Sequence, residues 1–432
     1  MANVDTARNT RQADKSVSST TEQAGAAKVP AATRTPSEFR SLEWEMRLRD
    51  TLEIGGLWTR DAKAPTYEEL RPYGPQETSG FPVYKDLEQR LLNAVEHPDP
   101  EIAHVMATCA AYAYSGPETV SMIMARMGLQ DNQCRMIQAS ADAMMLHSTA
   151  FLIQSKSGRV GILCYRGAEP HDFVHRMGDV DRAPERIAYR ACHPSATVHA
   201  GVYRNVRATR YEVMNALRHA SDRHSVRTSM PNGSPGLDLG RVDGRLEALY
   251  ITGHGHGGAM AALMGVMIRR ERKYREALGD RLKAVYTYGQ PMIGDPRFAE
   301  ACDHDEFLRQ NVIRYIYDRD VVPHLPPAAS GSFRHFGREY RYEIPHIRNV
   351  ISDVLGRSEA HLPGRTGELR TGGHPAGQVP YLLGMPMSAP AFVARVFPVA
   401  RSLPAVHSID DHLPHHYLSA LTPPGVQNEF GD

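Results

Sequence analysis

The feature that most constrains the fold is Gly253-His254-Gly255-His256-Gly257, which stands between a predicted strand and a predicted helix. The residues before it, 249–252, are apolar, aromatic or β-branched and indicate a short buried strand. The residues after it, 258–264, are small or apolar and predict the start of a helix. Because glycine lacks a Cβ atom, three alternating glycines let a strand turn sharply into a helix.

A strand, a glycine-flanked turn and a helix form the nucleophile elbow of α/β-hydrolases, whose pattern is G-x-S-x-G. The central position here is Gly255, so the serine hydroxyl that would attack a substrate is absent. Gly253 and Gly257 fit the pattern because larger side chains at these positions would collide with the strand and the helix. The central residue of an elbow is strained by about 1–3 kcal/mol, and we expect glycine to relieve that strain.

The glycine-rich turn also suggests two nucleotide-binding motifs. A phosphate-binding P-loop is excluded because no G-K-[ST] follows the glycines. Gly253, Gly255 and Gly258 do match the G-x-G-x-x-G spacing of dinucleotide-binding folds. The acidic residue expected about 20 residues further on does not close a clear βαβ unit, since residues 269–273 are mostly basic. We therefore favour a hydrolase and expect no cofactor.

Segments downstream of the elbow carry an acid and a base in the chain order of α/β-hydrolases. Residues 283–288 and 312–317 read as strands, and residues 296–306 between them read as a helix. Asp320 follows the second of these strands, and His412 lies near the C-terminus. The order nucleophile, acid, histidine is that of the α/β-hydrolase catalytic triad.

The chain resembles the class 3, fungal-type, lipase family over about residues 100 to 422, in five blocks that occur in the family's order. The blocks match the family's oxyanion turn, its V-H-x-G-F-Y and T-G-H-S-x-G-G-A motifs, its Y-T-F-G-Q-P-x-V-G motif and its D-I-V-P-x-L-P-P motif. They are residues 162–168, 198–203, 252–259, 286–294 and 320–327.

The resemblance implies a role for each matched residue. Gly255 occupies the nucleophile position, Asp320 matches the acid and His412 matches the general base. The oxyanion hole would consist of the backbone N–H groups of Ala168 and His256. Ala168 departs from the family because it lacks the hydroxyl that members usually add to this hole. The ending of the family also predicts a last helix that Tyr417 opens.

Other interpretations of these residues remain open at this stage. Asp318 is an alternative acid, although the Val-Val-Pro after Asp320 favours Asp320. Asp411 or His412 would instead cap the last helix. His254 and His256 lack third and fourth ligands nearby, and residues 302–306 read as a solvated helix end, so we expect no metal site.

Composition agrees with a globular protein that acts on a small molecule. The net charge of +1 gives no electrostatic reason to expect nucleic acid or an acidic membrane as partner. Five widely separated Cys residues argue against a disulfide framework. We expect no signal peptide and no transmembrane segment, and a cytoplasmic location by default, with signal-less export left open. The expected partner is a lipid or ester substrate, with possible peripheral contact to a lipid surface; the oligomeric state is open.

The chain is expected to divide into three parts. Residues 1–36 are predicted to be disordered, residues 37–99 to form a helical and linker extension, and residues 100–425 to form the catalytic domain. The domain carries insertions at about 169–197, 221–244 and 333–405. The first would hold a lid or an ordinary surface helix around Phe173, Val174 and Met177. The last would supply an acyl-chain wall, a lipid contact or a loop packed on the core.

The sequence predicts an α/β-hydrolase fold, a mostly parallel sheet with helices on both faces. The predicted function is that of a lipase-like carboxylic ester hydrolase that acts on acyl glycerol or related lipid esters. Its Ser-Asp-His machinery carries Gly255 in place of the nucleophile, so we expect little or no turnover. The alternative is a non-catalytic lipid- or partner-binding protein built on the same fold.

Overall fold

A computed structural model describes most of the chain between residues 82 and 423. The described residues are 82–141, 146–168, 184–186, 195–227, 240–344, 368–372, 376–379, 407 and 410–423. The chain divides into two compact units, residues 1–57 and 58–432, and every described residue belongs to the second. The predictions for residues 1–36, for a helix after residue 37 and for a lid around Phe173, Val174 and Met177 lie outside the described residues.

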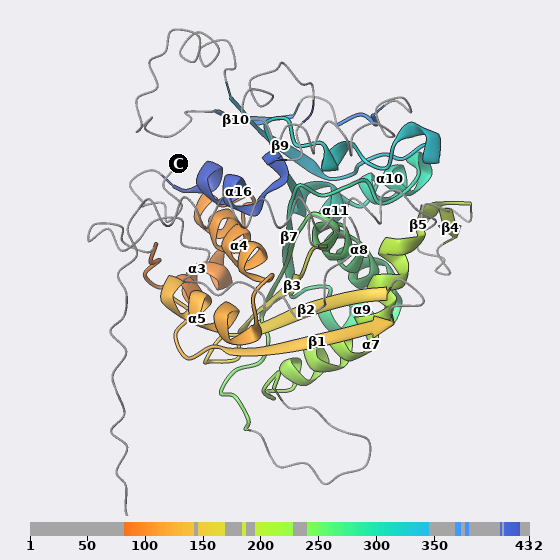
Figure 1. The fold of residues 1–432 in the computed structure, drawn as a ribbon. Coiled ribbons are helices and arrows are strands. Elements are labelled where there is room, and N and C mark those ends of the chain that lie inside the picture. The colour runs from red at the N-terminus through yellow and green to blue at the C-terminus, as the bar shows by residue number, and fades with distance from the viewer. Residues whose placement is uncertain are drawn as a thin grey trace, which may run out of the picture. The chain divides into compact units, whose positions relative to one another are not determined.

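An eight-stranded sheet forms the centre of this unit (Figure 1), in the order β1-β2-β3-β6-β7-β8-β9-β10. Strands β3, β6, β7, β8 and β9 run parallel, whereas β1, β2 and β10 pair antiparallel with their neighbours. The strands are β1 (Gln133–Ala141), β2 (Leu146–Gln154), β3 (Val160–Tyr165), β6 (Ala248–His254), β7 (Leu282–Tyr288), β8 (Val312–Tyr317), β9 (Arg338–Glu343) and β10 (Glu368–Thr371). A separate hairpin pairs β4 (Pro184–Arg186) with β5 (Thr197–His199).

Helices cover both faces of the sheet (Figure 1). One face carries α3 (Leu87–Asn93), α4 (Pro100–Tyr112), α5 (Pro117–Met127) and α16 (Pro414–Leu421). The other carries α7 (Ala200–Ser221), α8 (His256–Arg270), α9 (Arg272–Leu278), α10 (Pro296–Asp303) and α11 (Glu306–Asn311). In the described part of the chain, short 3₁₀ turns span Val322–His324, Ala328–Ser330 and Asp410–His412. The predicted α/β-hydrolase fold, a mostly parallel sheet flanked by helices, is confirmed.

Local sequence signals explain where the helices begin. The Asp99 carboxylate caps α4 by accepting the N–H groups of Glu101 and Ile102, and Pro100 opens the helix. Asp295 caps α10 in the same way. The single helix predicted over residues 296–306 is two helices, because Asp305 ends the first segment and caps α11 by accepting the N–H of Leu308.

Two segments near the predicted boundaries join the core of the described unit. Leu87 and Leu91 on α3, within the predicted extension 37–99, are fully buried in the same apolar cluster as α4. Within the predicted insertion 333–405, β9 and β10 lengthen the main sheet. Within the described residues, no helix is both long enough and apolar enough to cross a membrane.

Candidate active site

Gly255 lies at the junction of β6 and α8, in a conformation that only glycine adopts readily. Its backbone dihedral angles are φ 55° and ψ −124°. Its N–H donates to the Tyr288 carbonyl oxygen at 2.8 Å, and its own carbonyl accepts the N–H of Ala259 at 3.1 Å. The unusual conformation therefore persists with glycine present, and glycine tolerates it instead of removing it.

The glycines on either side of Gly255 are required by close backbone contacts. A Cβ atom on Gly253 would collide with the backbone of Gly257 one helical turn away. A Cβ atom on Gly257 would collide with the backbone at Tyr165 and Arg166, where β3 ends. The first turn of α8 thus packs directly on the loop that follows β3, as the sharp turn predicted from the sequence requires.

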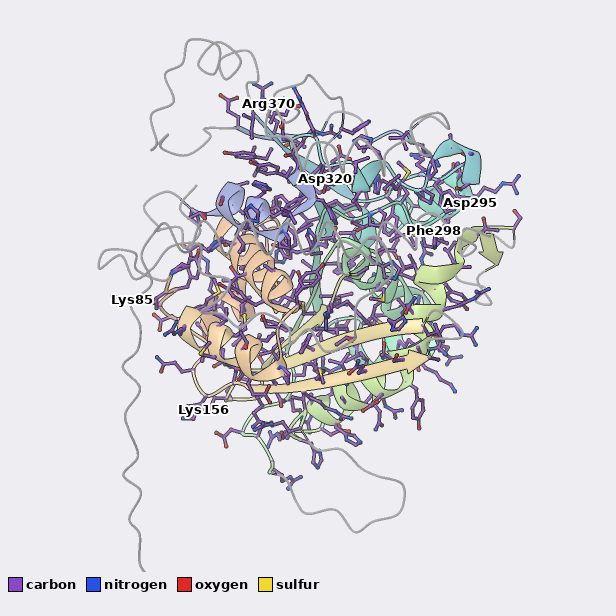
Figure 2. The ribbon with its side chains drawn as sticks, in the orientation of Figure 1. Lys85, Lys156, Asp295, Phe298, Asp320 and Arg370 are labelled. Carbon is purple, nitrogen blue, oxygen red and sulfur yellow. The ribbon has the colours of Figure 1, made fainter. Side chains whose placement is uncertain are left out.

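An acid and a base meet beside this junction although 92 residues separate them in sequence. The His412 Nδ1 atom lies 2.8 Å from Asp320 Oδ2, and the Asp320 side chain is completely buried. A buried carboxylate needs partners; Asp320 Oδ1 accepts the N–H of Val322 at 2.8 Å, and Oδ2 also accepts the Tyr417 hydroxyl at 2.5 Å. Figure 2 shows Asp320 at the end of the sheet away from Lys156, which lies in the β2–β3 turn.

Tyr417 supports Asp320 from the middle of α16, not from its first residue as predicted. Its hydroxyl accepts the N–H of Tyr317 at 3.1 Å and donates to Asp320, so both functions of the oxygen are used. Burial, followed by the nearby Asp320 charge, raises the pKa of the Tyr417 hydroxyl well above its usual value. A raised pKa keeps the proton on the hydroxyl, which therefore donates to Asp320.

The imidazole ring of His412 lies next to Gly255 at the centre of the elbow. His412 Nε2 lies 2.8 Å from the point where a Cβ atom would stand on Gly255, and Cε1 lies 3.2 Å from it. Because Nδ1 faces the Asp320 carboxylate, the proton of a neutral imidazole resides on Nδ1 and Nε2 is the basic nitrogen. The structure thus brings together Gly255, Asp320 and His412, in the arrangement predicted from their order in the chain.

Gly289 is a site residue that sequence reasoning missed. It follows β7 with φ +59°, and a Cβ atom there would stand 2.7 Å from Asp320 Oδ2 and 2.7 Å from His412 Nδ1. Only a glycine lets the acid and the base approach each other across this backbone. Its place in the Gly-Gln-Pro block after a predicted strand was the available signal.

The carboxylates of Asp318, the alternative acid, and of Asp411, the alternative helix cap, accept backbone N–H groups of other residues. Asp318 Oδ1 accepts the N–H of Ile344 at 3.3 Å, and Asp411 Oδ2 accepts the N–H of Arg319 at 3.1 Å. The carboxylate on His412 Nδ1 is that of Asp320. The residue at the N-cap position of α16 is Leu413, so neither Asp411 nor His412 occupies that position.

The two residues proposed from the resemblance for an oxyanion hole lie on neighbouring elements. Tyr165 at the end of β3 is paired with Gly253 of β6, so the loop carrying Ala168 emerges beside the elbow. Ala168 packs against an apolar cluster of Val321, Val322, Leu325 and Val379. His256 is the first residue of α8, where backbone N–H groups have no partner within the helix. Their role as donors stays a prediction.

No group of three or more His, Cys, Asp or Glu side chains within the described ranges is arranged to hold a metal ion. His254, considered with His256 as a ligand pair, instead bonds the Tyr114 hydroxyl and the carbonyl of His412. Cys302, expected in a solvated helix end, lies on α10 with its side chain fully buried in the core.

Comparisons with known proteins agree with this geometry. The family model described as lipase (class 3) matches residues 171–330. A lipase of Rhizomucor miehei is 43% identical over 94 residues, which cover 21% of this chain and 23% of that protein. A triacylglycerol lipase OBL1 of Nicotiana tabacum is 36% identical over 108 residues, covering 24% of this chain and 18% of the relative. The chain thus aligns with about a fifth of the length of these relatives.

Among solved structures, the Rhizomucor miehei triacylglyceride lipase aligns with 79% of this chain and 99% of its own, at 17% identity and a TM-score of 0.45. The lipase II of Rhizopus niveus aligns with 56% of this chain and 80% of its own, at 20% identity and a TM-score of 0.41. The match of residues 171–330 and the sequence relatives identify this part of the chain with the class 3, fungal-type, lipase family.

Proposed function

We propose that this protein is a lipase-like carboxylic ester hydrolase by lineage, directed at acyl glycerol or related lipid esters, with Gly255 in the position of the nucleophile. The observation that carries the proposal is the Asp320–His412 pair, in which His412 Nε2 lies 2.8 Å from the position that a Cβ atom would take on Gly255. An imidazole held in this tautomer by a buried carboxylate is the base of a serine hydrolase.

In this proposal each residue has a distinct task. Asp320 orients His412 and stabilises the imidazolium that forms when Nε2 takes a proton. The N–H groups of Ala168 and His256 would stabilise the negative oxygen of the tetrahedral intermediate. With glycine at 255, no side-chain oxygen is present to form an acyl-enzyme, so His412 can only activate a water molecule.

A second candidate is a non-catalytic lipid- or partner-binding protein on the same fold. The observation that favours it is the position of the His412 ring, which stands where a side chain on residue 255 would need room. In the present arrangement Asp320 and His412 are both in place, but the His412 ring stands too close to residue 255 for a serine side chain unless the ring moves.

Substitution Gly255→Ser separates the two candidates. The hydrolase proposal expects the variant to cleave p-nitrophenyl esters orders of magnitude faster than the parent chain, because a nucleophile contributes that much to turnover. The gain should disappear in Gly255→Ser/His412→Ala and persist in Gly255→Ser/His415→Ala, which alters a neighbouring imidazole. A Gly255→Ser protein that folds, stays inert towards short and medium acyl esters and still binds lipid would favour the binding protein.

A further inference from the structure

His254, immediately before Gly255 in the elbow, is buried and hydrogen-bonded through both ring nitrogens. Its Nδ1 atom lies 3.0 Å from the Tyr114 hydroxyl, and its Nε2 atom lies 2.7 Å from the backbone carbonyl oxygen of His412. A carbonyl only accepts, so Nε2 carries the proton and donates a hydrogen bond to the His412 carbonyl oxygen, and Nδ1 accepts from the Tyr114 hydroxyl. The His412 carbonyl therefore sets the tautomer of His254, and the Tyr114 hydroxyl holds the other side of the ring.

The His254 ring also lies against the His412 ring. Their centroids are 4.4 Å apart with an interplanar angle of 32°. Burial, followed by the nearness of His412, lowers the pKa of His254 well below its ordinary value. His254 therefore stays neutral when His412 takes up a proton, which avoids two like charges in contact.

Tyr114 touches the other half of the site as well. A Cβ atom on Gly167, next to Ala168, would collide with the Tyr114 hydroxyl and would stand 2.7 Å from the carbonyl oxygen of His254. The hydroxyl is thus packed against the loop proposed to supply an oxyanion donor. The Tyr114 hydroxyl therefore contacts both the loop after β3, at Gly167, and His254, the residue before Gly255.

We propose that Tyr114 and His254 are positioning residues for the base: the Tyr114 hydroxyl orients His254, which fixes the main chain and ring of His412. This rests on the proposed function only in taking His412 as the base. Each ring nitrogen of His254 has one assigned partner, so losing the hydroxyl leaves a buried acceptor unsatisfied and removes one of the two bonds that orient the ring. A ring held through Nε2 alone can tilt, and the main chain of His412 that it bonds would shift with it.

The test uses the chain as it exists, with Gly255, and reads His412 directly by NMR. Tyr114→Phe removes one oxygen and keeps the ring. We expect the downfield Nδ1–H resonance of His412, which reports its bond to Asp320, to move or to be lost through exchange with water. The titration of His412 should shift with it. His254→Phe keeps a ring beside His412 but removes both hydrogen bonds, and should produce the same loss.

The matched control is Tyr84→Phe. Tyr84 makes the same kind of buried bond, 2.7 Å from its hydroxyl to Nδ1 of His104 on α4, and takes no part in the proposed chain from Tyr114 to His412. We expect this variant to lose stability without changing the His412 signals. Unaltered His412 resonances and titration in a folded Tyr114→Phe protein would overturn the proposal. If His254→Phe does not fold, Tyr114→Phe decides alone.

The outcome is separable from that of the proposed function. A Gly255→Ser protein that fails to hydrolyse esters would remove the hydrolase, whereas the His412 resonances would still report positioning. If Gly255→Ser is active, adding Tyr114→Phe should lower kcat with little change in KM, and adding Tyr84→Phe should leave both close to their parent values. An active Gly255→Ser/Tyr114→Phe protein with unchanged kcat would contradict the positioning role alone.

Discussion

The Nε2 atom of His412 lies 2.8 Å from the position that a Cβ atom would take on Gly255. A serine that hydrogen-bonds an imidazole nitrogen keeps that nitrogen roughly 3.5 Å from its own Cβ atom. A serine at 255 therefore requires the ring to retreat by roughly 0.7 Å, against its bonds to Asp320 and His254. With glycine at position 255, the His412 ring can keep its present position.

The first prediction concerns stability. Gly255→Ala should lower the free energy of unfolding by about 1–3 kcal/mol through backbone strain alone, and further through contact with His412. Gly240→Ala is the control for strain without contact, because its φ is +91° and nothing lies within 4 Å of the added Cβ. Gly377→Ala has open space and no positive φ. Urea denaturation should rank the losses 255, then 240, then 377; an equal or more stable Gly255→Ala would contradict the geometry.

The segments around the elbow could be predicted because their signals are local. Residues 249–252, 283–288 and 312–317 are continuous apolar or β-branched runs, and each lies within a parallel strand whose residues are nearly all fully buried. Glycines placed at a strand–helix junction then leave few alternatives to an elbow.

Strand β9 could not be predicted in this way. Its sequence, Arg-Glu-Tyr-Arg-Tyr-Glu, alternates charges and reads as solvated surface. Glu339 is buried against Arg314 of β8, whose guanidinium lies 3.1 Å from its carboxylate, a pairing across 25 residues that no local pattern reveals. The hydrogen bond between Tyr114 and His254 could not be predicted for the same reason, because the two residues are 140 positions apart in sequence.

A second prediction concerns residual chemistry. Triad mutants retain roughly 10³–10⁴-fold acceleration over water from binding and the oxyanion hole, so the parent chain should hydrolyse p-nitrophenyl esters weakly at most. A fluorophosphonate, which labels activated serines, should leave the parent unlabelled and label Gly255→Ser at position 255. Stoichiometric labelling of the parent at another serine would show that the nucleophile has been misplaced.

A third prediction tests the close approach at Gly289. Gly289→Ala places a methyl group 2.7 Å from both Asp320 Oδ2 and His412 Nδ1 and should separate the acid from the base. In the Gly255→Ser background, the esterase rate should fall by about two orders of magnitude or more, as expected for a misplaced catalytic group. Gly377→Ala in that background should retain the rate. An unimpaired Gly289→Ala protein would mean that the Asp320–His412 bond is not needed.

The last prediction is a loss of stability in acid. Burial lowers the pKa of His97 and of His104 from 6.5 to about 4. Between these values the unfolded chain binds more protons than the folded one, so unfolding becomes easier as pH falls. The stability from keeping both rings neutral is therefore complete above pH 6.5 and declines as the pH falls towards about 4.

Urea midpoints measured across this range should fall with pH in the parent chain. His104→Gln removes one of the buried imidazoles that contribute, so the fall should be shallower, whereas His304→Gln, which alters an exposed imidazole, should follow the parent curve. His104→Gln also gives up the bond to the Tyr84 hydroxyl, and this lowers the whole curve at neutral pH. The slope of the urea midpoint against pH, and not its value at neutral pH, therefore reports the titration. A slope unchanged by His104→Gln would assign the acid sensitivity to other groups.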